Sequence, residues 1–436
     1  MEGESDSFIF ATKSKKMKNQ QLHIVVVGNG AAGNSAASAI RRASKKVNIT
    51  VIAEEPHPQY SPGVLSKKYI SGEMTKEEVF IKKFEDYSKE NIDILLDQKV
   101  YEIDAGKKSV MLGNRSIRYD TLIIATGSRP VLPRIEGVNK GKVFTLKSLK
   151  DAEAIFNCPG EKVVVVGAGP IGVEASISLK KGGREVFLVE LKEWVLPNAF
   201  DERPAEILRN TIESHNIEVL TGEKLIKIWG SGNIQGVSTD RRELKCDMVV
   251  LALGMVPETR LAQEGGIEIG ALGGIKVNEE MMTSIEDVYA CGDCVEAKDA
   301  ITGKTILSPL WHNAIQQGDV AGCNAAGVKK HYDGSMNISC TDVFGVAAVS
   351  IGHTRDRFEN DRLRVVERNN GYYHRLLIRD GIIVGAQFIG KIESVGILLN
   401  IMRKGYSLGR IQTILNDRSL LLRTPGYYRI CSDMPE

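Results

Sequence analysis

Three closely spaced glycines follow an apolar stretch near the start of the chain. Residues 23–43, HIVVVGNGAAGNSAASAIRRA, place Gly28, Gly30 and Gly33 between a predicted strand and a predicted helix. Glycine there makes a tight turn, lets the backbone approach a pyrophosphate and lets the helix pack on the strand. The helix N-terminus offers free N–H groups and a partial positive charge to the phosphates. The predicted contacts are Gly28, Gly30, Ala31, Ala32 and Gly33.

The same unit recurs further along the chain. Residues 162–190, KVVVVGAGPIGVEASISLKKGGREVFLVE, again run from an apolar stretch through a glycine turn into a predicted helix and a second strand. A lone glycine triplet is weak evidence, but the strand and helix also fall where a dinucleotide-binding unit needs them. The chain is therefore predicted to be α/β, with two Rossmann-like domains. The predicted contacts of the second turn are Gly167, Gly169, Pro170, Ile171 and Gly172.

Carboxylates end the second strand of each unit. Glu54 and Glu55 stand about 20 residues beyond the first glycine turn, where an acidic residue binds a ribose hydroxyl. Glu190 holds the corresponding place in the second unit and favours the free 2′-hydroxyl of NADH, because no arginine follows immediately to hold a 2′-phosphate. Two dinucleotide sites in one chain suggest one tightly held flavin and one exchanging nicotinamide, whose rings carry the hydride chemistry.

Composition narrows the class of protein further. A net charge of +2 over 436 residues argues against a dedicated nucleic-acid surface. The longest apolar runs are too short to span a bilayer, so we expect neither a nucleic-acid nor a membrane partner. Seven scattered cysteines do not form a disulfide framework, and this favours the cytoplasm.

Further motifs, in order, resemble the pyridine nucleotide–disulfide reductase superfamily. YDTLIIATGSRP (119–130) and DMVVLALGMVPET (247–259) look like its two crossings between FAD and NAD domains. TSIEDVYACGDCVEA (283–297) is similar to its late FAD motif, in which an aspartate meets the flavin's ribityl or pyrophosphate portion. The resemblance implies FAD and NADH as cofactors. It adds these cofactor contacts: Val100, Ala125, Thr126, Gly127, Arg129, Gly254, Gly292 and Asp293.

The resemblance also implies a domain plan. The last hundred or so residues show short alternating strands with an Asp-Gly hairpin turn, then an amphipathic helix within 393–406. In relatives this part is an α+β domain that builds a homodimer. The predicted plan is a flexible leader (1–20), an FAD domain (21–142 and 262–332), an NAD domain (143–261) and a dimerisation domain (333–436). The tail, 424–436, is aromatic and partly polar, which is compatible with capping an interface or with docking a partner.

The stretch YSPGVLSKKYISG, residues 60–72, lies where disulfide-reducing members carry a flavin-adjacent cysteine. The first cysteine of this chain is Cys158, so a flavin-to-thiol relay at that place is excluded. The stretch resembles instead the Tyr-x-x-x-x-Leu-Ser-Lys pattern of reductases that serve ferredoxins or rubredoxins. That resemblance implies that Lys67 approaches the flavin N5 edge and pairs with Glu174. The alternative is that the two lysines are merely solvated.

Two other features remain open. PLWHNAIQQGDVAG (309–322) resembles a Trp-x-Asn-Ala-x-x-Gln pattern of the same branch, which makes Trp311 a candidate contact on the electron-exit path or else a core or interface aromatic. Cys291 and Cys294 have the spacing of a redox dithiol, but they overlap the FAD motif. No metal site is predicted, because zinc needs four ligands and no second cysteine pair stands nearby.

Three functions are compatible with these features. The leading hypothesis is an FAD-dependent NADH:acceptor oxidoreductase that passes electrons to a ferredoxin, a rubredoxin or another iron–sulfur protein, or that runs in reverse. The first alternative is a cysteine-free NADH oxidase that reduces oxygen. The second is the flavin subunit of a larger complex, or a nucleotide-sensing flavoprotein.

Overall fold

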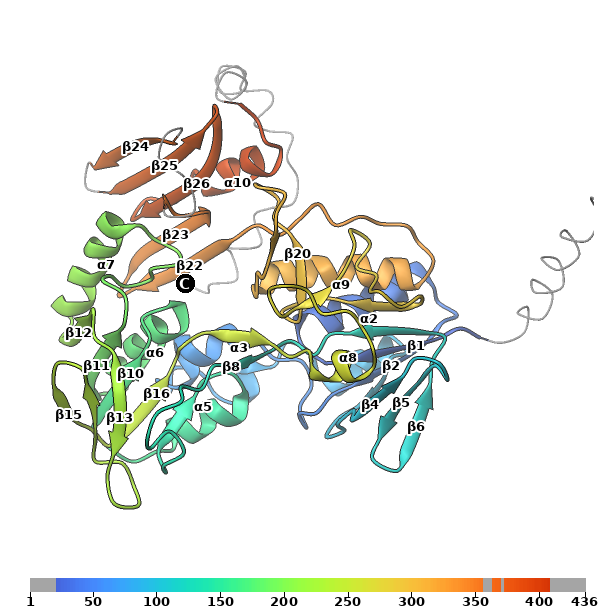
Figure 1. Ribbon diagram of the computed structural model, residues 1–436, viewed down its shortest axis with the longest axis horizontal. Helices are drawn as coiled ribbons and strands as arrows, with labels where there is room; N and C mark the ends of the chain where they lie inside the picture. Colours follow the sequence, from blue (N-terminus) through green and yellow to red (C-terminus); the bar gives the residue numbers. More distant parts are fainter. Residues whose placement is uncertain (1–20, 356–362, 370–371, 408–436) are drawn as a thin grey trace, which may run out of the picture.

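The computed structural model describes residues 21–355, 363–369 and 372–407 (Figure 1). The expected leader, 1–20, and the tail, 424–436, lie outside the described residues. None of the described helices is both long and apolar enough to cross a membrane.

A parallel sheet in the order β19-β7-β1-β2-β3 carries the first glycine turn. Its strands are almost wholly apolar, as expected for a parallel sheet buried on both faces. β19 comes from far along the chain and pairs with β7, so this unit is built from two separate segments. The strands are β1 (His23–Val27), β2 (Asn48–Ile52), β3 (Asp93–Leu95), β7 (Thr121–Ile124) and β19 (Val288–Ala290).

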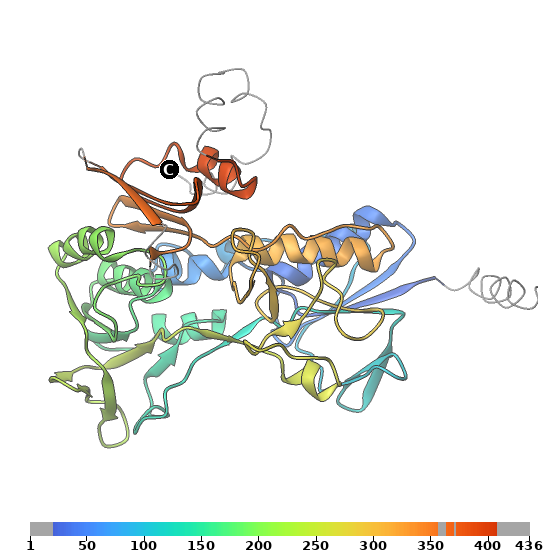
Figure 2. The same ribbon diagram turned by 45° about the horizontal axis from the view of Figure 1, so that its top comes forward.

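Helices α2 (Ala31–Ala43) and α9 (Trp311–Ala325) lie side by side against this sheet (Figures 1 and 2). A Cβ on Gly318 or Gly322 of α9 would overlap the backbone of α2, so these two glycines allow the close approach. The packing brings the N-terminal part of α9 to the first glycine turn.

Shorter elements complete this unit. They are α4 (Phe84–Lys89), α8 (Arg260–Glu264), an antiparallel sheet of β4 (Glu102–Asp104), β5 (Ser109–Leu112) and β6 (Arg115–Arg118), and a small sheet of β18 (Ile275–Lys276), β20 (Val295–Lys298) and β21 (Thr305–Ile306). Three other short elements follow β2 in the chain, namely α3 (Pro62–Val64), the π-helix η1 (Leu65–Tyr69) and the 3₁₀ turn η2 (Glu77–Val79), and the buried residues of η1 and η2 pack in the core around the second parallel sheet.

A second parallel sheet, in the order β12-β11-β10-β16-β9, carries the second glycine turn. Its elements are β9 (Val143–Thr145), α5 (Leu149–Phe156), β10 (Lys162–Val166), α6 (Pro170–Lys181), β11 (Glu185–Glu190), α7 (Glu202–Ser214), β12 (Ile217–Thr221) and β16 (Met248–Leu251), with an antiparallel sheet of β13 (Leu225–Trp229), β14 (Gly236–Thr239) and β15 (Glu243–Lys245).

The two stretches predicted to cross between domains lie together. β8 (Ser128–Pro130) and β17 (Met255–Pro257) form an antiparallel pair between the two parallel sheets (Figure 1). The α/β class with two Rossmann-like units is therefore confirmed, while the residues at which the domains begin and end stay predictions.

The C-terminal part is an antiparallel sheet in the order β22-β23-β26-β25-β24 with a helix packed on it. The predicted hairpin is confirmed, because Asp380 and Gly381 both take positive φ between β25 and β26. Hydrogen bonds of 3.1 Å between Asp201 and Gln387 join this sheet to the second parallel-sheet unit. The elements are β22 (Ile338–Val343), β23 (Val346–Gly352), β24 (Leu363–Asn369), β25 (Tyr373–Arg379), β26 (Ile382–Ile389) and α10 (Val395–Arg403).

Candidate functional site

The first glycine turn separates positions needed for packing from a position open to a ligand. A Cβ on Gly28 would overlap the carbonyl of Ala125, and a Cβ on Gly33 would overlap the carbonyl of Gly28. A Cβ on Gly30 would meet nothing within 4 Å. The chain's own packing therefore accounts for Gly28 and Gly33, whereas the bare backbone of Gly30 stands at the N-terminus of α2, next to Ala31 and Ala32. A pyrophosphate fits there.

The second turn has the same arrangement. A Cβ on Gly167 would overlap the carbonyl of Ala252, and one on Gly172 would overlap Gly167, while Gly169 again has nothing within 4 Å. Pro170 begins α6 at a position whose N–H would have no helical partner, and Ile171 follows it. Both turns therefore fit a dinucleotide by the same physical criterion.

The two acidic residues after β2 have different surroundings. Glu54 is exposed, and its carboxylate pairs with Lys99 at 2.8 Å, directly before the predicted contact Val100. Glu55 accepts a 2.9 Å hydrogen bond from the hydroxyl of Tyr60. Glu55 thus holds the start of the 60–72 stretch, and the ribose contacts expected of Glu54 and Glu55 stay predictions.

Glu190 is buried beside the second glycine turn. Its two oxygens accept hydrogen bonds from the backbone N–H groups of Ala168 (2.6 Å) and Lys192 (2.8 Å). The carboxylate is therefore fixed in place at the end of β11, with lone pairs left for a ribose hydroxyl.

Replacing Glu190 with alanine should lower kcat/KM for NADH by about tenfold or more and reduce the preference for NADH over NADPH, since a carboxylate accepts from the 2′-hydroxyl and repels a 2′-phosphate. Steady-state kinetics with both nucleotides measures this. Glu185→Ala is the matched control, because Glu185 begins the same strand and pairs at the surface with Lys162. An unchanged nucleotide preference in Glu190→Ala would contradict the role.

Several predicted contacts at each crossing bond to residues of the opposite crossing segment. The hydroxyl of Thr126 donates to the carbonyl of Glu258 at 2.6 Å, and the carbonyl of Gly127 accepts from the N–H of Glu258. Arg129 pairs with the Glu258 carboxylate at 3.6 Å, and the carbonyl of Gly254 accepts from Val131. These bonds tie β8 to β17, and the cofactor contacts expected of these residues stay predictions.

The loop after β19 reaches the start of α2. A Cβ on Gly292 would lie 2.8 Å from the Cβ of Ala32, and the Gly292 N–H donates to Gln317 of α9 at 2.8 Å. The carboxylate of Asp293 accepts from the hydroxyl of Ser128 at 2.8 Å and lies 3.7 Å from the ammonium of Lys147. The structure therefore brings the late motif to the first crossing. It adds Ser128, which lies inside the motif of residues 119–130, and Lys147, for which the sequence carried no signal.

Lys67 and Glu174 lie together, as the resemblance implied. The Lys67 Nζ is 3.6 Å from Glu174 Oε1, with side-chain exposures of 40% and 10%. The hydroxyl of Ser66 donates to Glu174 Oε2 at 2.7 Å. Burial raises the pKa of the Glu174 carboxyl, while the charge of Lys67 and the bond from Ser66 act to lower it. Ser66 belongs to the Leu-Ser-Lys pattern, so the pattern itself was a signal for this third member.

Trp311 differs from the asparagine and the glutamine of its pattern, whose buried side chains hydrogen-bond to the backbone. Asn313 is fully buried and exchanges hydrogen bonds with the backbone of Met336, and Gln317 holds Gly292. Trp311, by contrast, is 37% exposed at the first position of α9. Its exposure argues against a core aromatic and leaves an interface or an electron-exit role.

Cys291 and Cys294 are both fully buried, and burial raises the pKa of both thiols. The Cys294 thiol donates to the Cys291 carbonyl at 3.3 Å. Because the reactive form of cysteine is the thiolate, we predict that neither thiol is labelled by a thiol reagent at neutral pH unless the protein unfolds. Peptide mass spectrometry after brief labelling tests this, with the half-buried Cys323 as the internal reference. Rapid labelling of Cys291 or Cys294 would restore the dithiol alternative.

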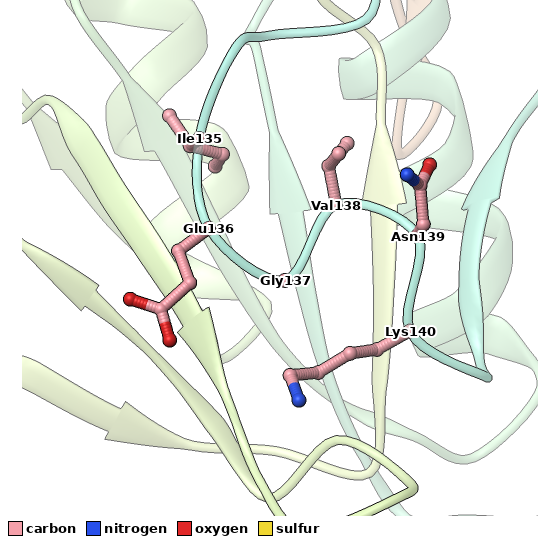
Figure 3. Close-up of a pocket in the computed structure, with 6 residues that line it drawn as sticks. All are labelled: Ile135, Glu136, Gly137, Val138, Asn139 and Lys140. Atoms are coloured by element: carbon pink, nitrogen blue, oxygen red, sulfur yellow. The ribbon is translucent and has the colours of Figure 1, made fainter.

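Within 21–355, 363–369 and 372–407, no group of three or more His, Cys, Asp or Glu residues could hold a metal ion. A hollow of about 290 Å³ lined by Ile135–Lys140 contains none of the predicted site residues (Figure 3). Lys140 there donates to the carbonyl of Gly230, which directly follows β13.

Comparison with known proteins agrees with this geometry. Residues 22–318 match the pyridine nucleotide-disulphide oxidoreductases, and residues 341–406 match the rubredoxin NAD+ reductase C-terminal domain. The chain is 35% identical over 393 residues to the NADH oxidase of Methanocaldococcus jannaschii, covering 85% of this chain and 88% of that protein. It is 34% identical over 350 residues to the NAD(P)H coenzyme A polysulfide/persulfide reductase of Pyrococcus horikoshii, covering 77% of each.

The structure of an NAD-dependent persulfide reductase from A. fulgidus superposes with a TM-score of 0.84 at 30% identity, covering 90% of this chain and 78% of that one. The predicted superfamily and cofactors are thus confirmed. The chain belongs to the pyridine nucleotide-disulphide oxidoreductase family and is an NAD(P)H oxidoreductase that uses FAD and NAD(H).

Proposed function

We propose that the protein is an NADH:acceptor oxidoreductase that passes electrons from FAD to an iron–sulfur or rubredoxin-like protein. The observation that carries the proposal is the ion pair between Lys67 and Glu174 of α6, because Lys67 lies in the stretch where disulfide-reducing members of the superfamily carry a cysteine. The match of residues 341–406 to the rubredoxin NAD+ reductase C-terminal domain supports it.

The chain's residues have distinct duties in this proposal. Bound FAD takes up a hydride from NADH and can release electrons singly. The turns at Gly30 and Gly169 hold the two pyrophosphates, and Glu54 and Glu190 bind ribose hydroxyls. Lys67 places a positive charge where negative charge develops on reduction, and the same charge offsets part of the cost of burying the Glu174 carboxylate. Trp311 lies on the path to the acceptor.

The test reduces the flavin anaerobically with NADH and then adds acceptors in separate runs. Rapid reoxidation by a ferredoxin or rubredoxin, with slow reoxidation by oxygen and by a disulfide, supports the proposal. Fast reoxidation by air favours the oxidase that the relative from Methanocaldococcus jannaschii is named for. Slow reoxidation by every acceptor, with co-purifying proteins, favours the flavin subunit.

Replacing Trp311 with alanine should slow reoxidation by the protein acceptor about tenfold and leave reoxidation by ferricyanide unchanged, because a small acceptor needs no docking surface. Stopped-flow absorbance measures both rates. Phe84→Ala is the control, since Phe84 is an exposed aromatic on a different helix, α4. Equal slowing with both acceptors would assign Trp311 to the structure of the domain instead.

We also propose that the protein is a cytoplasmic homodimer built through its C-terminal domain. The superfamily resemblance supports the dimer, and the scattered cysteines support the compartment. Light scattering on the purified protein measures the oligomeric state, and a monomer at micromolar concentration would contradict the proposal.

A further inference from the structure

Helix α6 contacts the Lys67 segment at two positions one helical turn apart. Glu174 meets the side chains of Ser66 and Lys67. Four residues later, the hydroxyl of Ser178 donates to the backbone carbonyl of Lys67 at 2.7 Å. Residues four apart lie on one face of a helix, so a single face of α6 contacts this segment at two points.

The gripped segment is a π-helical turn, η1. The N–H of Ile70 bonds to the carbonyl of Leu65 and that of Glu73 to the carbonyl of Lys68, each five residues back, at 3.3 and 3.0 Å. Short π-turns of this kind are rare in proteins overall, and those that occur are often found at functional sites. Here the turn presents two consecutive side chains, Ser66 and Lys67, to the same carboxylate.

We propose that Ser178 is a positioning residue that holds Lys67 against Glu174. Its side chain is fully buried, and its one O–H donor is spent on the Lys67 carbonyl. The bond pins the backbone from which the lysine side chain extends, so that side chain searches fewer conformations. The significance of this placement rests on the proposed function of Lys67.

The same contact links the two nucleotide sites. Helix α6 begins at Pro170, directly after the open glycine Gly169, where the pyridine nucleotide's pyrophosphate fits. Its middle holds Lys67 of the FAD-binding unit through Glu174 and Ser178. One rigid helix therefore sets the position of the lysine relative to the pyridine nucleotide site.

Chemical labelling of the FAD-loaded protein tests the placement without measuring activity. In Ser178→Ala, an amine-reactive reagent should label Lys67 about 3–10-fold faster relative to Lys68, the loss expected for one hydrogen bond. Lys68 is the neighbouring, half-buried lysine of the same turn, outside the contact with Glu174, and serves as the internal reference. Ser176→Ala is the matched control, because Ser176 is equally buried on α6 but donates to the Gly172 carbonyl of its own helix. Equal labelling in all three proteins overturns the proposal.

A double-mutant cycle separates this inference from the proposed function. Ser178→Ala should slow reoxidation by the protein acceptor about 3–10-fold, and it should cause no further slowing in a Lys67→Met background. Independent, additive slowing overturns the positioning role. If Lys67→Met alone leaves the rates unchanged, the proposed function fails, and the labelling result by itself decides the role of Ser178.

Discussion

Replacing Gly28 with alanine is expected to abolish FAD binding and to lower the free energy of unfolding by about 3 kcal/mol or more. Gly28 has φ +116, which a side chain disfavours, and its Cβ would overlap the Ala125 carbonyl at the end of β7. The backbone cannot shift to relieve the strain or the overlap, because β1 and β7 are hydrogen-bonded neighbours in one buried sheet. Flavin absorbance after gel filtration and a urea unfolding curve measure the two effects.

Gly30→Ala is the matched variant in the same turn. Gly30 has ordinary extended backbone, and its Cβ would meet no atom of the chain within 4 Å. The free energy of unfolding of the FAD-free protein should therefore change by less than about 1 kcal/mol, while FAD binding weakens because a methyl group occupies the approach to the pyrophosphate. Destabilisation of both variants to the same extent would show that Gly30 serves packing and would remove the argument for a ligand there.

Replacing Lys67 with methionine is expected to slow electron transfer to the protein acceptor by roughly ten- to hundredfold, since removing one positioned charge or donor typically costs that much or more. The change keeps the length of the side chain and removes its charge. The flavin midpoint potential should also fall, because the reduced, negatively charged flavin loses a stabilising cation. Stopped-flow absorbance and a redox titration measure the two quantities.

Lys68→Met is the control for this prediction, because Lys68 stands next to Lys67 on the same π-turn, whereas Lys67 is the lysine that pairs with Glu174. Equal effects of the two variants would mean that only the overall charge of the turn matters.

The pH dependence of stability provides a second check. Burial raises the pKa of Glu174, and loss of Lys67 removes an opposing charge. A carboxyl with a raised pKa in the folded state binds its proton more tightly there, so stability falls as pH rises between the unfolded and folded pKa values. In Lys67→Met the folded-state pKa of Glu174 rises further, so the fall in stability should extend to higher pH and be larger in total. An unchanged pH interval would argue against direct coupling of Lys67 to Glu174.

The glycine turns and the overall class of fold were predictable because their determinants are local in the chain. A strand, a glycine turn, a helix and a carboxylate occur within about thirty residues, so their order alone specifies a Rossmann-like unit. The same holds for the C-terminal hairpin at Asp380 and Gly381. The reason why each individual glycine is required could not be predicted from the sequence. Whether packing or a ligand requires a given glycine depends on neighbours such as Ala125 and Ala252, which come from other strands.

The sequence alone thus determined the fold class and the two cofactors, and it excluded a thiol relay in the 60–72 stretch. Only the tertiary structure showed that Glu55 is engaged by Tyr60, that Asp293 meets Ser128 and Lys147, and that Ser178 grips the turn of Lys67. The physical reason is separation along the chain. Apart from the short Glu55–Tyr60 contact, these pairs join residues brought together by the packing of different sheets and helices, and a spacing rule for one strand or helix carries no information about such contacts.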